Sequence, residues 1–313
     1  MEVRVADTDE TQSVGVARRD LMIAGAGAVL ALGIGSAETA FAQAAATPAP
    51  AQTVTPGKVA VERRGAVLLV GIDRPLAQNL LDPPILIGLG KAYFELEHDD
   101  TLRVAVLHGV GQNFSLGADL PALAVALASG AFPPKDGDFI NSFGLRPPFR
   151  SKPVVVAVQG GVKYGGHELF LASDIRVAAT DTTFSQGEVT RGVFPGGGAT
   201  IRMTREAGWA NAMRYMLTGD EWGAEEARRL GLVQEVVPSG KQLDRAVEIA
   251  QKVAAAAPLG IRATLASSRQ ALAGEEVAFA ALQAELLRLA QSEDRKEFVR
   301  ALQERRQPVF QGR

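Results

Sequence analysis

Two glutamates and a pair of glycines are the residues of this sequence that could carry catalysis together. Gly165-Gly166-His167-Glu168 opens a predicted helix at 165–172, and Glu188 lies in the loop after a predicted strand at 182–184. Backbone N–H groups at a helix N-terminus can stabilise an oxyanion, and glycine lets a substrate approach the backbone closely. Two carboxyl groups with shifted pKa values can divide the work of a general acid and a general base. Taken singly, the glycine pair could make only a tight turn, and either glutamate could be a solvated charge.

Four motifs surround these residues, in a fixed order along the chain. They occupy residues 111–120 (GQNFSLGADL), 152–175 (with GGHEL and SDI), 184–200 (FSQGE, then GVFPGGGAT) and 217–233 (LTGD, then LGLV). In this order and spacing they resemble the crotonase superfamily, whose members include enoyl-CoA hydratases and isomerases. The resemblance runs from about Val59 to Phe310.

The resemblance implies an α/β fold, a spiral of ββα units with a helical C-terminal trimerisation region. It implies a site for acyl thioesters, in which the backbone amides of Ala118 and Gly165 stabilise the enolate oxygen. Glu168 and Glu188 match the two acids of the family's hydratases, and retention of both favours a hydratase over a pure isomerase. Coenzyme A is expected only as part of the substrate, with no separate cofactor.

Further positions are assigned to substrate or coenzyme A contacts through the same resemblance: Leu116, Asp119, Leu120, Gly166 and Arg305. Asp119 also suits the N-cap of a helix that begins near Leu120. Many relatives have a hydrophobic residue and a lysine after Gly-Ala-Asp, whereas Leu120 is followed here by Pro121. Arg305 falls where a cation can reach the coenzyme A phosphates, and it could equally be part of a solvated helix end.

Three neighbouring side chains receive roles without proton transfer. His167 is expected to be a packing or polar-shell residue, because adjacent helix positions point in different directions. Arg191 and the turn at 194–196 are expected to shape the acyl pocket.

The elements that position these residues are mainly strands in the first half of the chain and helices in the second. Residues 59–63 and 66–72 predict a hairpin-like start around Gly65. The other predicted elements are strands at 104–108, 153–158, 175–178 and 182–184 and helices at 86–96, 165–172, 199–206, 210–217, 224–230, 241–256, 258–273, 275–290 and 293–305. The stretch 121–150 lacks clean periodicity and predicts a loop-rich, mobile segment.

The N-terminus resembles an export signal. Arg18-Arg19 precedes an uncharged run from Leu21 to Ala37, and Ala40-Phe41-Ala42 is a small-x-small cleavage pattern. The adjacent arginines suggest a twin-arginine signal. The alternative, an uncleaved anchor, is disfavoured because the 17-residue run is shorter than the about 20 residues of a span. We therefore expect cleavage near Ala42 and a periplasmic protein without a stable membrane span, or a cytoplasmic one if the signal is not used.

The chain is thereby divided into four expected regions: an export signal at 1–42, an Ala/Pro-rich tether at 43–57, a crotonase core at 58–250 and a C-terminal helical region at 251–313. The core is large enough to fold without disulfides, and the chain has no cysteine.

Composition excludes several classes of protein. The 313 residues carry 33 Lys+Arg and 35 Asp+Glu, so no positive excess exists to bind nucleic acid. Zero cysteines and three histidines argue against a thiolate or histidine metal site.

The predicted function is an enoyl-CoA hydratase-like lyase acting as a homotrimer or dimer of trimers. Because coenzyme A esters are cytoplasmic, the export signal leaves two alternatives open. One is a crotonase-fold hydrolase or isomerase acting on a non-CoA β-carbonyl compound in the periplasm, and the other is a non-catalytic acyl-ligand binding protein.

Overall fold

The structure is a computed structural model that describes residues 55–132, 134, 137–272 and 274–313. The predicted export signal at 1–42 lies outside these residues, as does most of the predicted tether at 43–57. In the part of the chain that is described, no helix combines the length and apolar character needed to cross a membrane.

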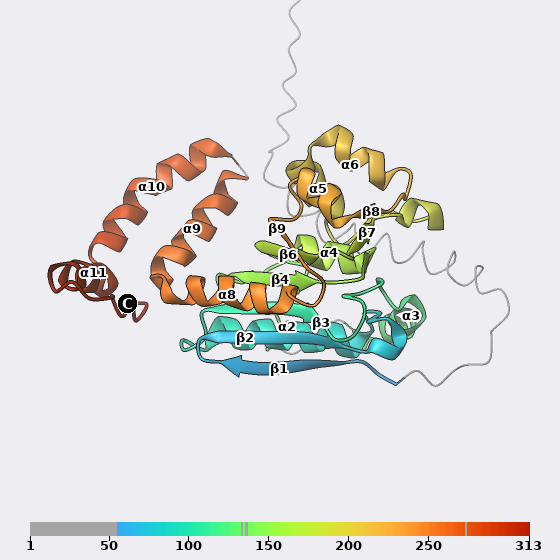
Figure 1. Cartoon of the computed structure of the whole chain (residues 1–313), viewed down its shortest axis with the longest axis horizontal. Helices are drawn as coiled ribbons and strands as arrows, with labels where there is room; N and C mark the ends of the chain where they lie inside the picture. Colours follow the sequence, from blue (N-terminus) through green and yellow to red (C-terminus); the bar gives the residue numbers. More distant parts are fainter. Residues whose placement is uncertain (1–54, 133, 135–136, 273) are drawn as a thin grey trace, which may run out of the picture. The chain divides into compact units, whose positions relative to one another are not determined.

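A six-stranded sheet lies at the centre of the fold (Figure 1). Its strands, in spatial order, are β1 (Lys58–Arg64), β2 (Val67–Asp73), β3 (Val104–Gly109), β4 (Val154–Val158), β6 (Ile175–Ala179) and β9 (Glu235–Val237). β1 and β2 pair antiparallel, which confirms the predicted hairpin, and every other neighbouring pair is parallel. Gly65 joins the two hairpin strands with a φ of 62°, a conformation that glycine adopts without steric cost.

A second, three-stranded sheet consists of β5 (Gly161–Lys163), β7 (Thr183–Ser185) and β8 (Trp222–Gly223). β5 pairs parallel with β7, and β7 pairs antiparallel with β8. This small sheet matters for function because the chain leaves β5 toward Gly165 and leaves β7 toward Glu188.

The helices lie mainly in the second half of the chain, as predicted. They are η1 (Pro75–Ala77), α2 (Pro83–His98), α3 (Leu120–Ala128), α4 (Gly165–Leu171), η2 (Glu188–Arg191), α5 (Ala199–Ala207), α6 (Trp209–Met216), α7 (Ala224–Arg229), α8 (Gln242–Ala255), α9 (Pro258–Ala271), α10 (Glu275–Ala290) and α11 (Glu293–Gln303). α8 runs through residue 250, where the predicted core region ends.

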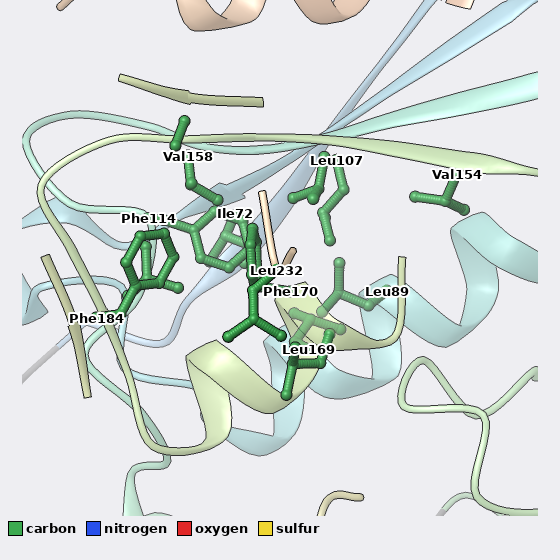
Figure 2. Close-up of a cluster of buried hydrophobic side chains, with 14 of the residues drawn as sticks. Ile72, Leu89, Leu107, Phe114, Val154, Val158, Leu169, Phe170, Phe184 and Leu232 are labelled. Carbon is green, nitrogen blue, oxygen red and sulfur yellow. The ribbon is translucent and has the colours of Figure 1, made fainter. Parts of the chain in front are cut away.

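The large sheet is covered on both faces because its strands are apolar on both sides. Leu68 and Val70 of β2 belong to the cluster that includes α2 and α4 residues, whereas Val67 and Leu69 pack with α8. Figure 2 shows part of the first cluster, in which Leu107 of β3 lies near Leu89 of α2. A near-continuous apolar run is typical of parallel strands that are buried on both faces.

The segment 121–150, predicted to be rich in loops, begins with a helix that was not predicted, because α3 occupies 120–128. Asp119 accepts a hydrogen bond from the amide of Ala122, and Pro121 lies in the first turn, so the helix has a regular start. Its apolar residues point in all directions and only Ala126 is buried. The helix therefore lacks the alternation of apolar and polar faces by which a sequence reveals a helix.

Candidate active site

The candidate site is built from loops that leave one edge of the large sheet. β3 and β4 run parallel, so their carboxyl ends lie at the same edge. The loop after β3 contains Ala118, and the chain after β4 reaches Gly165 through the short strand β5. An isolated bridge between Ser115 and Val162 holds these two segments together.

The predicted oxyanion donors, the amides of Ala118 and Gly165, lie next to each other. A Cβ atom added at Gly165 would be 3.7 Å from the amide nitrogen of Ala118. Among the residues that the structure describes, neither amide has a protein acceptor. Gly165 is the first residue of α4, where backbone N–H groups point out of the helix. Two free, preorganised donors beside one another suit an oxygen that gains negative charge.

The loop that carries Ala118 is fixed by bonds on both sides of that residue. The amide of Leu81 donates to the Gly117 carbonyl at 2.8 Å, and the Asp119 amide donates back to the Leu81 carbonyl at 3.0 Å. The Asp119 side chain caps α3, as predicted. These bonds hold the Ala118 amide in place without using its N–H.

Arg74 was missed by the sequence reasoning, although it anchors this loop. Its buried guanidinium donates to the Asp119 carboxylate at 2.7 Å and lies 3.4 Å from Asp82. Asp119 therefore pairs with the cation of Arg74. This ion pair gives Asp119 a structural role in addition to the substrate contact that was predicted for it. The position of Arg74 in the sequence could have pointed to this role. Arg74 directly follows β2, whose carboxyl end lies beside that of the parallel strand β3.

Glu168 is buried on α4, three residues after Gly165. Its Oε1 accepts a hydrogen bond from the amide of Ala199 at 3.1 Å, at the start of α5. A Cβ at Gly197 would lie 2.5 Å from Glu168 Oε2, so only glycine leaves room for the carboxylate. Burial, opposed by the hydrogen bond from the Ala199 amide and assisted by the charge of Glu188, raises the pKa of Glu168 to about 7.

Glu188 is the second buried carboxyl, and it opens η2 directly after the small sheet. Gln186 Nε2 donates to Glu188 Oε1 at 2.7 Å, whereas buried Oε2 has no partner among the described residues. Burial raises the pKa of Glu188 as well. The structure thus brings the two predicted acids within electrostatic reach of each other, and both are poised to hold a proton nearer neutral pH than an exposed glutamate.

Gln186 is a further residue that the sequence did not single out as functional. It lies between Glu188 and His167, whose Nδ1 is 2.5 Å from Gln186 Oε1. His167 itself packs among aromatic rings, which confirms the predicted packing role. A glutamine two residues before a glutamate carries no distinctive signal, because this role depends on a contact across 19 residues.

The other predicted contact residues lie around the Ala118 loop. Gly166 is needed by the fold itself, since a Cβ there would lie 2.5 Å from the Ser115 carbonyl oxygen. The Leu116 side chain lies over Gly161, and Leu120 is exposed at the start of α3. Their contacts with substrate stay predictions.

Arg305 is not joined to this site by any contact among the described residues. It lies exposed after α11, and the tail that follows it bonds through the Phe310 carbonyl to Arg103. Arg103 immediately precedes β3, whereas the site residues follow the carboxyl ends of the strands. A contact of Arg305 with coenzyme A stays a prediction.

Arg191, predicted to shape the acyl pocket, lies 3.8 Å from the ring centroid of Tyr164. Tyr164 directly precedes Gly165 and has a φ of 52°, which is strained for a residue other than glycine. The cation–π contact gives this strained residue a fixed ring at the side of the oxyanion donors.

Fold and site together define a class of protein: an α/β enzyme with paired backbone donors and paired acids, as in the crotonase superfamily. Residues 62–313 match the family model for enoyl-CoA hydratase/isomerase. An enoyl-CoA hydratase of Mycobacterium tuberculosis is 34% identical over 81% of this chain and 96% of its own. The 2,3-dehydroadipyl-CoA hydratase of Escherichia coli is also 34% identical, over 81% of this chain and 98% of its own.

A solved structure agrees with these matches. The crystal structure of an enoyl-CoA hydratase from Mycobacterium tuberculosis H37Rv has a TM-score of 0.74 and 36% identity, covering 82% of this chain and 99% of that one. The chain belongs to the enoyl-CoA hydratase/isomerase family. The predicted crotonase-like fold and enzyme class are confirmed.

Proposed function

We propose that this enzyme adds water across the α,β double bond of an enoyl thioester. The observation that carries the proposal is the site itself, in which two amides without an acceptor among the described residues, those of Ala118 and Gly165, are combined with two buried carboxyls with raised pKa values, one of them on the helix that Gly165 opens. Relatives named as hydratases of coenzyme A thioesters, at about one third identity, support the same reaction.

The reaction places charge where the site has donors. As water oxygen bonds to Cβ, the π electrons move toward the thioester oxygen, and the amides of Ala118 and Gly165 stabilise the resulting enolate. One carboxyl group takes a proton from the water while the other delivers a proton to Cα. Glu168 and Glu188 together supply these two tasks, and the net change is the addition of H₂O.

A panel of three assays separates this proposal from its alternatives. We expect the full-length protein to hydrate crotonyl-CoA. The reaction is monitored by the loss of absorbance of the conjugated double bond. Cleavage of a β-diketone without hydration would favour a carbon–carbon hydrolase. Binding of the thioester without turnover would favour an acyl-ligand binding protein and would refute the hydratase proposal.

We further propose that the protein is exported through residues 1–42, on the strength of Arg18-Arg19 and the Ala40-Phe41-Ala42 pattern. Replacing both arginines by lysine should then retain the protein in the cytoplasm, measured by cell fractionation. Unchanged periplasmic recovery would exclude the twin-arginine route.

The proposed assembly is a homotrimer or dimer of trimers. α10 supports it by exposing large apolar side chains at the spacing of one helix face, namely Phe279, Leu282 and Leu286. Light scattering should give a mass three or six times that of one chain. A monomer at micromolar concentration would contradict the assembly.

A further inference from the structure

His167 is a buried titratable residue that the hydration mechanism does not use. It lies on α4 between Gly166 and Glu168 and has no exposed surface. The rings of Phe170, Phe184 and Trp222 surround it, with centroids 5.3–5.8 Å from its own. This burial lowers the pKa of His167 to about 4, so the imidazole is neutral at neutral pH.

A neutral imidazole donates from only one ring nitrogen, and its contacts decide which one. Nδ1 lies 2.5 Å from Gln186 Oε1, an atom that can only accept, so Nδ1 carries the proton. Nε2 has no partner among the described residues, as suits a nitrogen without a proton. The indole N–H of neighbouring Trp222 is also unpartnered, and a second N–H at Nε2 would add another orphan donor.

The amide orientation of Gln186, from which this tautomer follows, is supported independently by the contact of the amide with Glu188. With Oε1 held by His167, the amide NH₂ faces Glu188 and donates to its Oε1 at 2.7 Å. When Glu188 is ionised, the reversed amide would set two acceptor oxygens against each other. Glu188 Oε2, which is buried, is left without a protein partner among the described residues.

We propose that His167 is a positioning residue that acts through Gln186: its Nδ1–H holds the glutamine amide, which in turn holds Glu188 Oε1 and leaves Oε2 for proton transfer. This inference rests on the proposed hydration. It assigns a role to two residues beyond the four that meet the substrate's reacting atoms.

The tautomer can be measured without any turnover. Nitrogen-15 spectra of the full-length protein at pH 7 should show one buried histidine with a protonated Nδ1 and a bare Nε2. The chain has only three histidines, and the signal that disappears in His167→Phe identifies it. A protonated Nε2 in the wild-type protein would overturn the proposal, whether or not the protein hydrates an enoyl thioester.

Two substitutions at His167 separate its hydrogen bond from its packing. His167→Phe keeps a ring but loses the donor, whereas His167→Asn keeps a side-chain N–H donor but leaves a cavity. We expect His167→Phe to lower kcat about 10- to 100-fold, because Gln186 is then no longer held and its hydrogen bond to the Glu188 carboxylate is lost, with KM changed less than twofold. His167→Asn should recover part of kcat although it melts at a lower temperature. If, among these two variants, the one with the lower melting temperature also has the lower kcat, His167 has a purely structural role and the proposal is overturned.

A double-mutant cycle tests the route through Gln186. Gln186→Leu alone should lower kcat to a similar extent, and adding His167→Phe to it should cost less than a further twofold. Equal losses from His167→Phe in both backgrounds would refute action through Gln186. His98→Phe, at the exposed end of α2, is the matched control and should leave kcat unchanged. Absence of hydration by the wild-type protein would refute the proposed function and leave the tautomer measurement to decide this inference.

Discussion

The proposed oxyanion half of the site, the amides of Ala118 and Gly165, differs from the proposed carboxylate half, Glu168 and Glu188, in the kind of atom that it would present to the substrate. The first half presents backbone N–H groups held by the fold, through bonds such as Leu81 to Gly117. The second half presents side chains whose pKa values are raised by burial. A side-chain substitution does not remove a backbone donor, but an atom added close to the donor can block it. A side-chain acid is lost with one isosteric change.

The largest effect should come from the carboxylate half. Glu168→Gln and Glu188→Gln each keep size and hydrogen bonding but remove the group that transfers a proton. Each should lower kcat about 10²- to 10⁴-fold, the usual contribution of a positioned acid or base. Thioester binding should survive, because the amides of Ala118 and Gly165 remain, and calorimetry with an unreactive acyl-CoA checks this.

The matched control for these substitutions is Glu225→Gln, an exposed glutamate on α7. It should leave kcat unchanged. Wild-type hydration by Glu188→Gln would exclude this residue from proton transfer. Loss of hydration with intact β-diketone cleavage would move the enzyme to the alternative reaction class.

The oxyanion half should respond to one added methyl group. In Gly165→Ala the new Cβ meets atoms no closer than 3.7 Å, so the fold tolerates it, but the methyl lies beside the Ala118 amide. We expect kcat/KM to fall about 100-fold, comparable to the loss of one oxyanion donor, with little change in melting temperature.

Gly166→Ala is the contrasting neighbour. Its Cβ would lie 2.5 Å from the Ser115 carbonyl oxygen, so this variant should lose about 1–3 kcal/mol of stability in urea unfolding. A stable Gly166→Ala paired with an unfolded Gly165→Ala would contradict the assigned roles of the two glycines.

The carboxylate half should also make stability depend on pH. The folded pKa of Glu168, about 7, is above its ordinary value of 4.5, so its protonated form contributes stability that is complete below pH 4.5 and lost as pH rises through 7. Glu168→Gln stays neutral and should therefore be more stable than wild type by about 3 kcal/mol above pH 7. The difference should vanish near pH 4.5 in chemical unfolding. A variant that is less stable than wild type at pH 8 would contradict the raised pKa.

The smallest effect is expected at the anchor of the oxyanion loop. Asp119→Asn keeps the cap of α3 and a hydrogen-bond acceptor for Arg74, which also retains Asp82. We expect kcat to change less than about fivefold, with a loss of about 1 kcal/mol in unfolding. A loss as large as that of Glu168→Gln would place Asp119 in the chemistry itself.

The same contrast explains what the sequence could and could not predict. Ala118, Gly165 and the two glutamates lie in contiguous motifs, so the order of the motifs and their resemblance to the family were enough to propose these residues for the site. Arg74 and Gln186 act through contacts across 45 and 19 residues, which no local pattern encodes. The strands β5, β8 and β9 have only two or three residues, too few to show a period, and were missed for that reason.

The most direct test of the account is a double-mutant cycle on Glu168 and Glu188, with crotonyl-CoA hydration as the readout. If the two acids act in one transition state, Glu168→Gln/Glu188→Gln should lose less activity than the product of the two single losses. Losses that multiply would show that the two carboxyls act independently, which would contradict the central claim that they share one transition state.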